Sequence, residues 1–307
     1  MKRYLMIVLA AALCLPLSAQ KTTEEYLTRY NLLVSRLGPT GVGIETLINK
    51  WEADFPDNED MLCAKFSYYF SKCMSSQVVK KDQKKFMGKA PLLSLDDSLG
   101  VKTNYFEEIF FEDSLYAMAS QALDKAIREY PDDLELRLTK VTSLVSYEKE
   151  SPDMATQTLL SLIDYNYTSK PSWVYAGAEV DPATFVQLVQ DYCLTFYTIG
   201  SDTSMESFRK ISERMSSYNP KNSQFLDNLG TYHLIARSDN KSALKYYSKA
   251  LKLDPGDYTA IKNTVLIARR DKNVKLEKKY LPLLIKAAEN EGEQLAAKAR
   301  LEALNTK

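Results

Sequence analysis

The sequence predicts an all-α protein in which antiparallel helical hairpins stack into a solenoid, with one small β-hairpin inserted near residues 92–106. Glycine is sparse, at 10 of 307 residues, while the helix formers Ala, Leu, Lys and Glu are plentiful. Apolar residues recur at helical spacing, for example Leu134, Leu138 and Val141. A proline-containing string that ends one helix and starts the next also recurs along the chain.

The first residues have the features of a secretory signal. A charged start at Lys2 and Arg3 is followed by the apolar run Leu5–Leu15 and by a small-residue site that ends at Ala19. An apolar run of about 11 residues is too short to anchor a protein in a bilayer. We therefore expect residues 1–19 to be a signal peptide and the protein to be exported, either periplasmic or peripheral to the outer membrane. No later segment is apolar enough to predict a membrane span.

Thirteen segments follow the apolar spacing of a helix, with Asp, Asn, Ser or Pro near many of their ends. Pro282 is expected to kink or break the helix that contains it. The predicted helices are Thr22–Arg36, Val42–Asp54, Glu59–Met74, Glu112–Glu129, Asp133–Glu148, Asp153–Tyr165, Pro182–Thr198, Thr203–Ser217, Asn222–Arg237, Lys241–Leu253, Asp257–Arg270, Val274–Asn290 and Glu293–Leu304.

Four similar strings mark the ends of successive helices: Phe55–Asp60, Tyr130–Glu135, Asn219–Gln224 and Asp254–Thr259. In each string, proline closes one helix and Asp, Asn or Ser can cap the next. The four prolines lie 75, 89 and 35 residues apart. The last gap is one repeat, the first is close to two, and the second needs an insertion. A degenerate repeat array therefore explains the strings better than unrelated turns do.

The clearest repeat unit is residues 222–255. Its second half places Ala243, Tyr247, Ala250 and Pro255 at relative positions 0, 4, 7 and 12, and Gly230 lies in its first half. The small residues allow two helices to approach closely, and the tyrosine fills the gap between them. In this pattern the unit resembles the tetratricopeptide repeat (TPR) family. The resemblance implies one repeat domain over residues 20–307, with capping helices at residues 274–304.

Two segments interrupt the helical pattern. Residues 75–104 are too long for a plain turn, and their parts Leu92–Leu95 and Val101–Phe106 are predicted to pair as a β-hairpin. Asn166–Asp181 carries Trp173 and Tyr175. Irregular segments with aromatic residues can bind partners, but they can equally be caps packed over a core. Both interpretations stay open.

The residue types that catalysis and metal binding require are few. His233 is the one histidine, and in the family its position faces the packed hairpin. Cys63, Cys73 and Cys193 follow the expected signal peptide, and we expect buried free thiols because an odd number gives no disulfide framework. No zinc spacing, catalytic triad or phosphate-binding loop is present. We therefore expect no enzymatic activity, no catalytic residue, no metal site and no cofactor.

The TPR resemblance implies a scaffold that binds a protein or peptide in a concave groove. Asn amides there could grip a peptide backbone, and the cations could attract carboxylates. The alternative that such an Asn only ties adjacent helices together stays open. The residues that family positions place in the groove are Gln224, Asp227, Asn228, Thr231, Thr259, Lys262, Asn263, Arg269 and Arg270.

The charge distribution bears on the partner. Residues 230–307 carry 16 basic and 9 acidic residues, which suits an anionic partner, although solvated helix faces explain the excess as well. Nucleic acid is not expected for an exported chain without an Arg-rich binding surface. A glycan-binding envelope protein on the same scaffold is the alternative to a peptide binder, and an enzyme is a remote third possibility. Peptide and glycan arrays would separate the first two.

Overall fold

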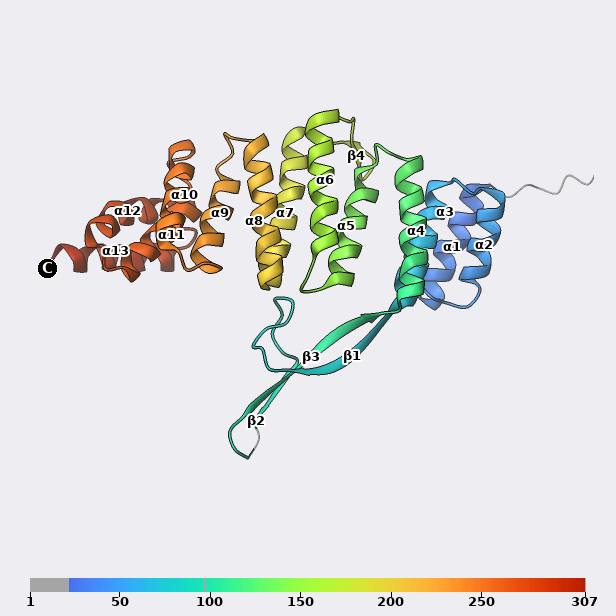
Figure 1. Ribbon diagram of the computed structural model, residues 1–307, viewed down its shortest axis with the longest axis horizontal. Coiled ribbons are helices and arrows are strands. Elements are labelled where there is room, and N and C mark those ends of the chain that lie inside the picture. Colours follow the sequence, from blue (N-terminus) through green and yellow to red (C-terminus); the bar gives the residue numbers. More distant parts are fainter. Residues whose placement is uncertain (1–21, 97, 307) are drawn as a thin grey trace, which may run out of the picture. The chain divides into compact units, whose positions relative to one another are not determined.

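The computed structural model describes residues 22–96 and 98–306 (Figure 1). The expected signal peptide, residues 1–19, lies outside the described residues. The chain divides into two compact units, and the expected repeat domain runs through both. The first unit holds the chain up to Lys72 together with Leu115–Ala126, and the second holds Cys73–Ser114 and Ile127–Lys307.

The first unit is a group of packed helices: α1 (Thr23–Leu37), α2 (Ile44–Asp54), α3 (Glu59–Cys73) and the middle of α4 (Asp113–Glu129). Thr22 starts α1 because its side chain accepts a hydrogen bond from the backbone N–H of Glu25. Tyr26 of α1 stacks on Trp51 of α2, with ring centroids 5.7 Å apart. The buried core of this unit contains Ile44, Ile48, Tyr68, Tyr69 and Ala119.

The second unit continues the helical pattern with α5 (Leu134–Glu148), α6 (Asp153–Ser169), α7 (Pro182–Ile199), α8 (Asp202–Tyr218), α9 (Gln224–Ile235), α10 (Asn240–Leu253), α11 (Tyr258–Arg270), α12 (Val274–Ala287) and α13 (Glu291–Asn305). Helices near in sequence pack as pairs, such as α5 with α6 and α9 with α10 (Figure 1). Every helix matches a predicted segment to within a few residues, which confirms the all-α helical-hairpin repeat fold. Among the described residues, no helix is both long and apolar enough to cross a bilayer.

Capping residues set the helix starts as the sequence pattern indicated. The side chains of Asp133, Asp239 and Asp257 each accept a hydrogen bond from the backbone N–H three residues further on. Pro282 behaves differently from the expected break, because α12 continues through it from Val274 to Ala287. Leu281 and Leu284 are buried in a core that α12 shares with α11 and α13, and this packing holds the helix together around the proline.

The hairpin of α9 and α10 is as tightly packed as its small residues predict. A Cβ atom on Gly230 would lie 2.5 Å from the ring of Tyr247, so only glycine fits beneath that ring. Leu229 is buried as well. The apolar cluster of this hairpin contains Leu234, Ala243, Tyr247, Ala250, Ala260 and Ile267, with Leu226 partly buried beside it.

The insertion after α6 packs over the helices of the second unit. It forms a short hairpin of β4 (Val174–Tyr175) and β5 (Ala178–Glu179). Trp173 is buried in the core, and its indole N–H donates to Asn166 Oδ1 at 2.9 Å. Arg137 lies over the Trp173 ring, 5.3 Å from its centroid. The aromatic residue that made this segment a binding candidate is therefore part of the core.

The β-arm, residues 74–111, is the second insertion. Its strands are β1 (Met74–Lys81), β2 (Leu93–Asp96) and β3 (Lys102–Phe111), in the antiparallel order β1-β3-β2 (Figure 1). The pairing of Leu93 with Tyr105 and of Asp96 with Lys102 confirms the predicted hairpin. The sequence did not predict β1, because that strand is mostly polar and has no alternation of apolar residues. It nevertheless pairs with β3 along its whole length.

Replacing Gly230 by alanine should destabilise the α9–α10 hairpin, because the new Cβ atom would overlap the Tyr247 ring. We expect the free energy of unfolding, measured by urea denaturation with circular dichroism, to fall by about 1–3 kcal/mol. Gly256→Ala is the matched control, since its Cβ would meet its nearest atom at 3.4 Å. The packing argument fails if both variants lose the same stability.

Candidate functional site

The groove positions predicted on α9 bond to neighbouring helices. Asn228 and Gln190 of α7 form a reciprocal amide pair, in which Asn228 Nδ2 donates to Gln190 Oε1 at 2.8 Å and Gln190 Nε2 donates to Asn228 Oδ1 at 3.1 Å. Thr231 shares a hydrogen bond with the Tyr247 hydroxyl at 3.1 Å. Gln224 is partly buried at the start of α9. The Asn228 contact is of the kind that ties adjacent helices together.

Two of the predicted cations on α11 form ion pairs with the last two helices. Lys262 Nζ lies 3.1 Å from Glu293 Oε1. Arg269 Nε lies 3.1 Å from Glu277 Oε1, and Arg300 Nε lies 2.7 Å from the same oxygen. Glu277 is almost fully buried, and the hydrogen bonds from Arg300 and Arg269 hold its pKa below the ordinary value against the effect of burial. These cations therefore hold the C-terminal helices in place.

The other predicted residues of α11 are also engaged. Asn263 Nδ2 donates to the Tyr247 hydroxyl at 3.0 Å, so Asn263 and Thr231 meet at one tyrosine. Arg270 donates to Asn240 Oδ1. Thr259 lies in the first turn of the same helix. The structure thus brings part of the predicted set together around Tyr247, and a groove function for the whole set stays a prediction.

Asp227, another predicted groove position, is a buried acid. Its side chain is only 6% exposed, and its Oδ1 has no hydrogen-bond partner among the described residues. Burial, a hydrogen bond with Asp257, and the charges of Asp257 and Asp254 raise the pKa of Asp227 to about 9. At neutral pH this carboxyl therefore carries a proton.

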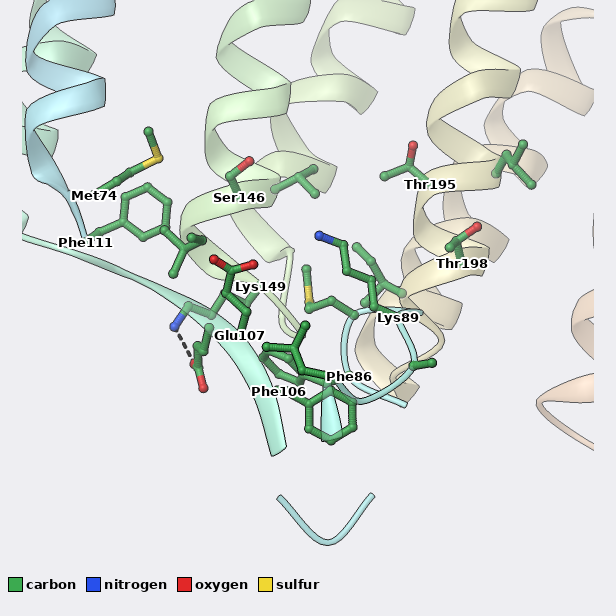
Figure 2. A pocket seen from close by; sticks show the side chains of 18 of the residues that line it. Met74, Phe86, Lys89, Phe106, Glu107, Phe111, Ser146, Lys149, Thr195 and Thr198 are labelled. Carbon is green, nitrogen blue, oxygen red and sulfur yellow. Dashed lines mark hydrogen bonds and ion pairs between the residues drawn. The ribbon is translucent and has the colours of Figure 1, made fainter. Parts of the chain in front are cut away.

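A pocket of about 590 Å³ opens between the β-arm and helices α5 and α7 (Figure 2). This volume is in the range of small-ligand and peptide side-chain sites. We call it the arm pocket, and it is lined by Met74, by residues 106–109 and 111 of β3, by loop residues 86, 87, 89, 90 and 92, by residues 145, 146 and 149 at the end of α5, and by residues 191, 194, 195, 198 and 199 of α7. Most of its lining is apolar.

An ion-pair network at Glu108 fixes one wall of the arm pocket. Lys149, just after α5, donates to Glu108 at 2.6 Å, and Lys81 of β1 approaches it at 2.9 Å. Burial opposes the ionisation of Glu108, but the two lysines outweigh it and hold the pKa of Glu108 below its ordinary value. Lys149 also lies 4.5 Å from the centroid of the Phe110 ring. The network joins β1, β3 and the end of α5.

A tight turn closes the pocket on the side of α7. Phe86 and Lys89 exchange backbone hydrogen bonds of 3.0 and 2.9 Å across Met87 and Gly88, both of which have positive φ. Phe86 is buried against Phe106, with ring centroids 6.0 Å apart (Figure 2). A Cβ on Gly88 would lie 2.4 Å from the Thr198 carbonyl oxygen. The turn therefore packs its backbone directly against the end of α7.

The lining of the arm pocket suits apolar side chains better than a reaction. No group of three or more His, Cys, Asp and Glu side chains in residues 22–96 and 98–306 is placed to hold a metal ion. The cysteines are free thiols, as expected, and burial raises the pKa of Cys193 to about 12, which keeps it protonated. The walls of the pocket offer apolar contacts, one fixed ion pair and a few hydroxyl groups.

Sequence reasoning reached half of this pocket. Residues 75–104 were one of the two candidate binding segments, and they supply the loop with Phe86 and Lys89. The helix α7 was not singled out, because its apolar residues lie on more than one face and core packing explains them. Leu194, which is 59% exposed on the pocket wall, is recognisable as a surface residue only in the folded chain.

Asp227 predicts a pH-dependent stability. Its pKa of about 9 in the folded chain lies above the value of about 3.9 in the unfolded chain, so the folded state holds an extra proton between these values. The free energy of unfolding should therefore fall as the pH rises from about 4 to about 9. Asp227→Asn should remove this loss and add about 2–4 kcal/mol at pH 7.

Urea denaturation at pH 5, 7 and 8.5 would measure this effect. The exposed Asp202→Asn is the control and should leave the pH profile of the wild type unchanged. Parallel pH profiles of the wild type and Asp227→Asn would contradict the assignment of the proton to Asp227.

Gly88 predicts a specific weak point of the arm pocket. Gly88→Ala should push the 86–89 turn away from Thr198, and amide hydrogen exchange of residues 86–92 should become faster. Gly100→Ala controls for backbone strain, because Gly100 also has positive φ but no atom of the described residues lies within 4 Å of its Cβ position. We expect Gly88→Ala to cost about 1–3 kcal/mol more stability than Gly100→Ala. Equal losses would mean that the turn does not depend on the contact with α7.

Comparisons with known proteins add no name. No family model and no curated protein matches the chain. Among solved structures, a crystal structure of the flexible tandem repeat domain from bacterial cellulose synthase aligns with 94% of this chain and 99% of that chain, at 13% identity and a TM-score of 0.27. A TM-score this low describes no shared overall shape, so the repeat fold rests on the helices described above.

Proposed function

We propose that this chain is a non-enzymatic scaffold that binds a protein or peptide partner, exported to the bacterial envelope, and that the arm pocket is its binding site. The proposal places the chain as a degenerate member of the TPR family, on the residue pattern of the α9–α10 hairpin. Export is inferred from the charged and apolar start of the sequence, residues 2–19.

The observation that carries the proposal is the arm pocket itself. It combines a mostly apolar wall with an exposed Leu194 on α7, although apolar side chains usually avoid exposure in such a concentration. Its walls are held by the Glu108 ion pairs and by the Gly88 contact, so the cavity is formed before any partner arrives. Preformed pockets bind tightly because little ordering is needed on association.

The lining favours a peptide over a glycan. Sugars need many hydrogen-bonding groups, and here the ionised Glu108 is already bonded to Lys149 and Lys81. The predicted groove on α9 and α11 is a weaker candidate for the same reason, because Asn228 and Asn263 use their amides within the chain. Partners there would have to displace these contacts.

The proposal predicts that Leu194→Glu abolishes peptide binding. A linear seven-residue peptide library would be selected against the full chain, and the affinity of the enriched peptides measured by fluorescence anisotropy. A carboxylate at position 194 would stand in the apolar wall, so we expect affinity to fall at least about tenfold. Leu266→Glu is the matched control, because Leu266 of α11 is similarly exposed, at 51%, and lies outside the pocket.

Both variants should keep the wild-type circular dichroism spectrum, since both leucines are exposed. The proposal is wrong if the library yields no peptide, or if Leu266→Glu weakens binding as much as Leu194→Glu does. Binding to a glycan array that depends on Leu194 would replace it with the glycan alternative.

A further inference from the structure

The strand β3 has one edge that is only half used. On one side it pairs with β1 from Asn104 to Phe111. On the other side it pairs with β2 from Lys102 to Tyr105, where β2 reaches its first residue, Leu93. Beyond Tyr105, no strand of the described residues lies on this second edge.

The register shows which backbone groups face the open edge. Just past the ladder, the N–H of Glu112 donates to the Cys73 carbonyl at 2.8 Å, on the side of β1. Backbone groups alternate between the two edges of a strand, so the N–H and C=O groups of Glu107 and Ile109 point away from β1. The carbonyl of Tyr105 agrees, because it accepts a hydrogen bond from Leu92 at 2.8 Å on that second edge.

The arm pocket lies along this open edge. Its lining includes consecutive β3 residues, from Phe106 to Ile109, whose side chains belong to both faces of the strand. From the described part of β1, it includes Met74 at the start of the strand. A cavity over one face of the sheet would meet alternate residues of β1 and β3 together. Figure 2 shows the lining side chains of α7 and of the 86–89 turn across the cavity from the strand.

We propose that the arm pocket binds an extended segment of a partner protein as an additional strand on β3, in line with β2. The N–H and C=O groups of Glu107 and Ile109 form the ladder, and alternate apolar side chains of the segment enter the cavity between Phe106 and Leu194. This inference rests on the proposed function, since it specifies how a peptide would occupy the same pocket.

Unpaired backbone groups distinguish a peptide from other apolar occupants. An acyl chain would fill the apolar cavity, but it would strip water from the edge of β3 and leave the groups of Glu107 and Ile109 without partners. A buried unpaired backbone group costs free energy comparable to a lost hydrogen bond. An extended peptide brings complementary groups at the required spacing and fills the cavity with its side chains. Its chemistry therefore matches both features of the site.

The test uses the peptide with the highest affinity from the library, synthesised with a single backbone N-methyl group at each position in turn. N-methylation removes one donor and blocks pairing on one edge only. We expect an alternating pattern, in which every second position loses at least about tenfold in affinity and the positions between change less than about threefold. A flat pattern across the peptide would overturn the strand-addition mode.

A second measurement addresses the protein side. Ile109→Pro removes an N–H that faces the cavity and is not used by β1, and edge positions of strands tolerate proline. We expect this variant to lose at least about tenfold in affinity, and Ile109→Val, which keeps the N–H, to bind like the wild type. Amide exchange at Glu107 and Ile109 in the unmodified chain should slow on peptide binding, and this readout holds even if the proline variant fails to fold.

The two proposals fail in different ways. If peptides bind in a Leu194-dependent manner but the N-methyl pattern is flat and Glu107 and Ile109 gain no protection, then the pocket binds peptides by another mode. If the library yields no peptide while decanoate binds and Leu194→Glu abolishes that binding, then both proposals are wrong and the site takes an acyl chain.

Discussion

The two ion pairs of Glu108 are the interaction on which the arm pocket depends. One carboxylate receives Lys81 from β1 and Lys149 from the end of α5, at 2.9 and 2.6 Å. Partial burial strengthens this electrostatic contact, because solvent screens it less than it would a surface pair. The contact fixes the β-arm relative to α5 and leaves the second edge of β3 opposite α7. Without that spacing, the apolar side chains of strand and helix would have no common cavity.

Close backbone approach is the second constraint, and it acts at two places. At Gly230 the absence of a side chain lets the Tyr247 ring lie directly on α9, and at Gly88 it lets the turn meet the Thr198 carbonyl. The first contact belongs to the repeat and holds one hairpin together. The second belongs to the insertion and closes the pocket. Both rely on a glycine where any larger residue would collide, but they serve different parts of the molecule.

The polar residues of α9 and α11 illustrate why a binding function is hard to assign from family positions. An Asn amide that could grip a peptide can equally pair with a neighbouring helix, and Asn228 pairs with Gln190. Lys262 and Arg269 are about half exposed in their ion pairs, and exposed pairs contribute little to stability. These cations therefore remain able to exchange partners, whereas the amides are more firmly engaged.

The sequence by itself determined the helices, their caps and the β2–β3 hairpin, because these depend on residues within a few positions of one another. Alanine and glycine spacing also identified the α9–α10 packing, since a repeat encodes its neighbour contacts at a fixed period. Only the tertiary structure decided that the polar β1 pairs with β3, that Trp173 is buried, and that Leu194 faces Phe106 across a cavity. Those outcomes depend on contacts between residues about 30 to 90 positions apart, and side-chain patterns within one segment carry no record of which distant segment will pack against it.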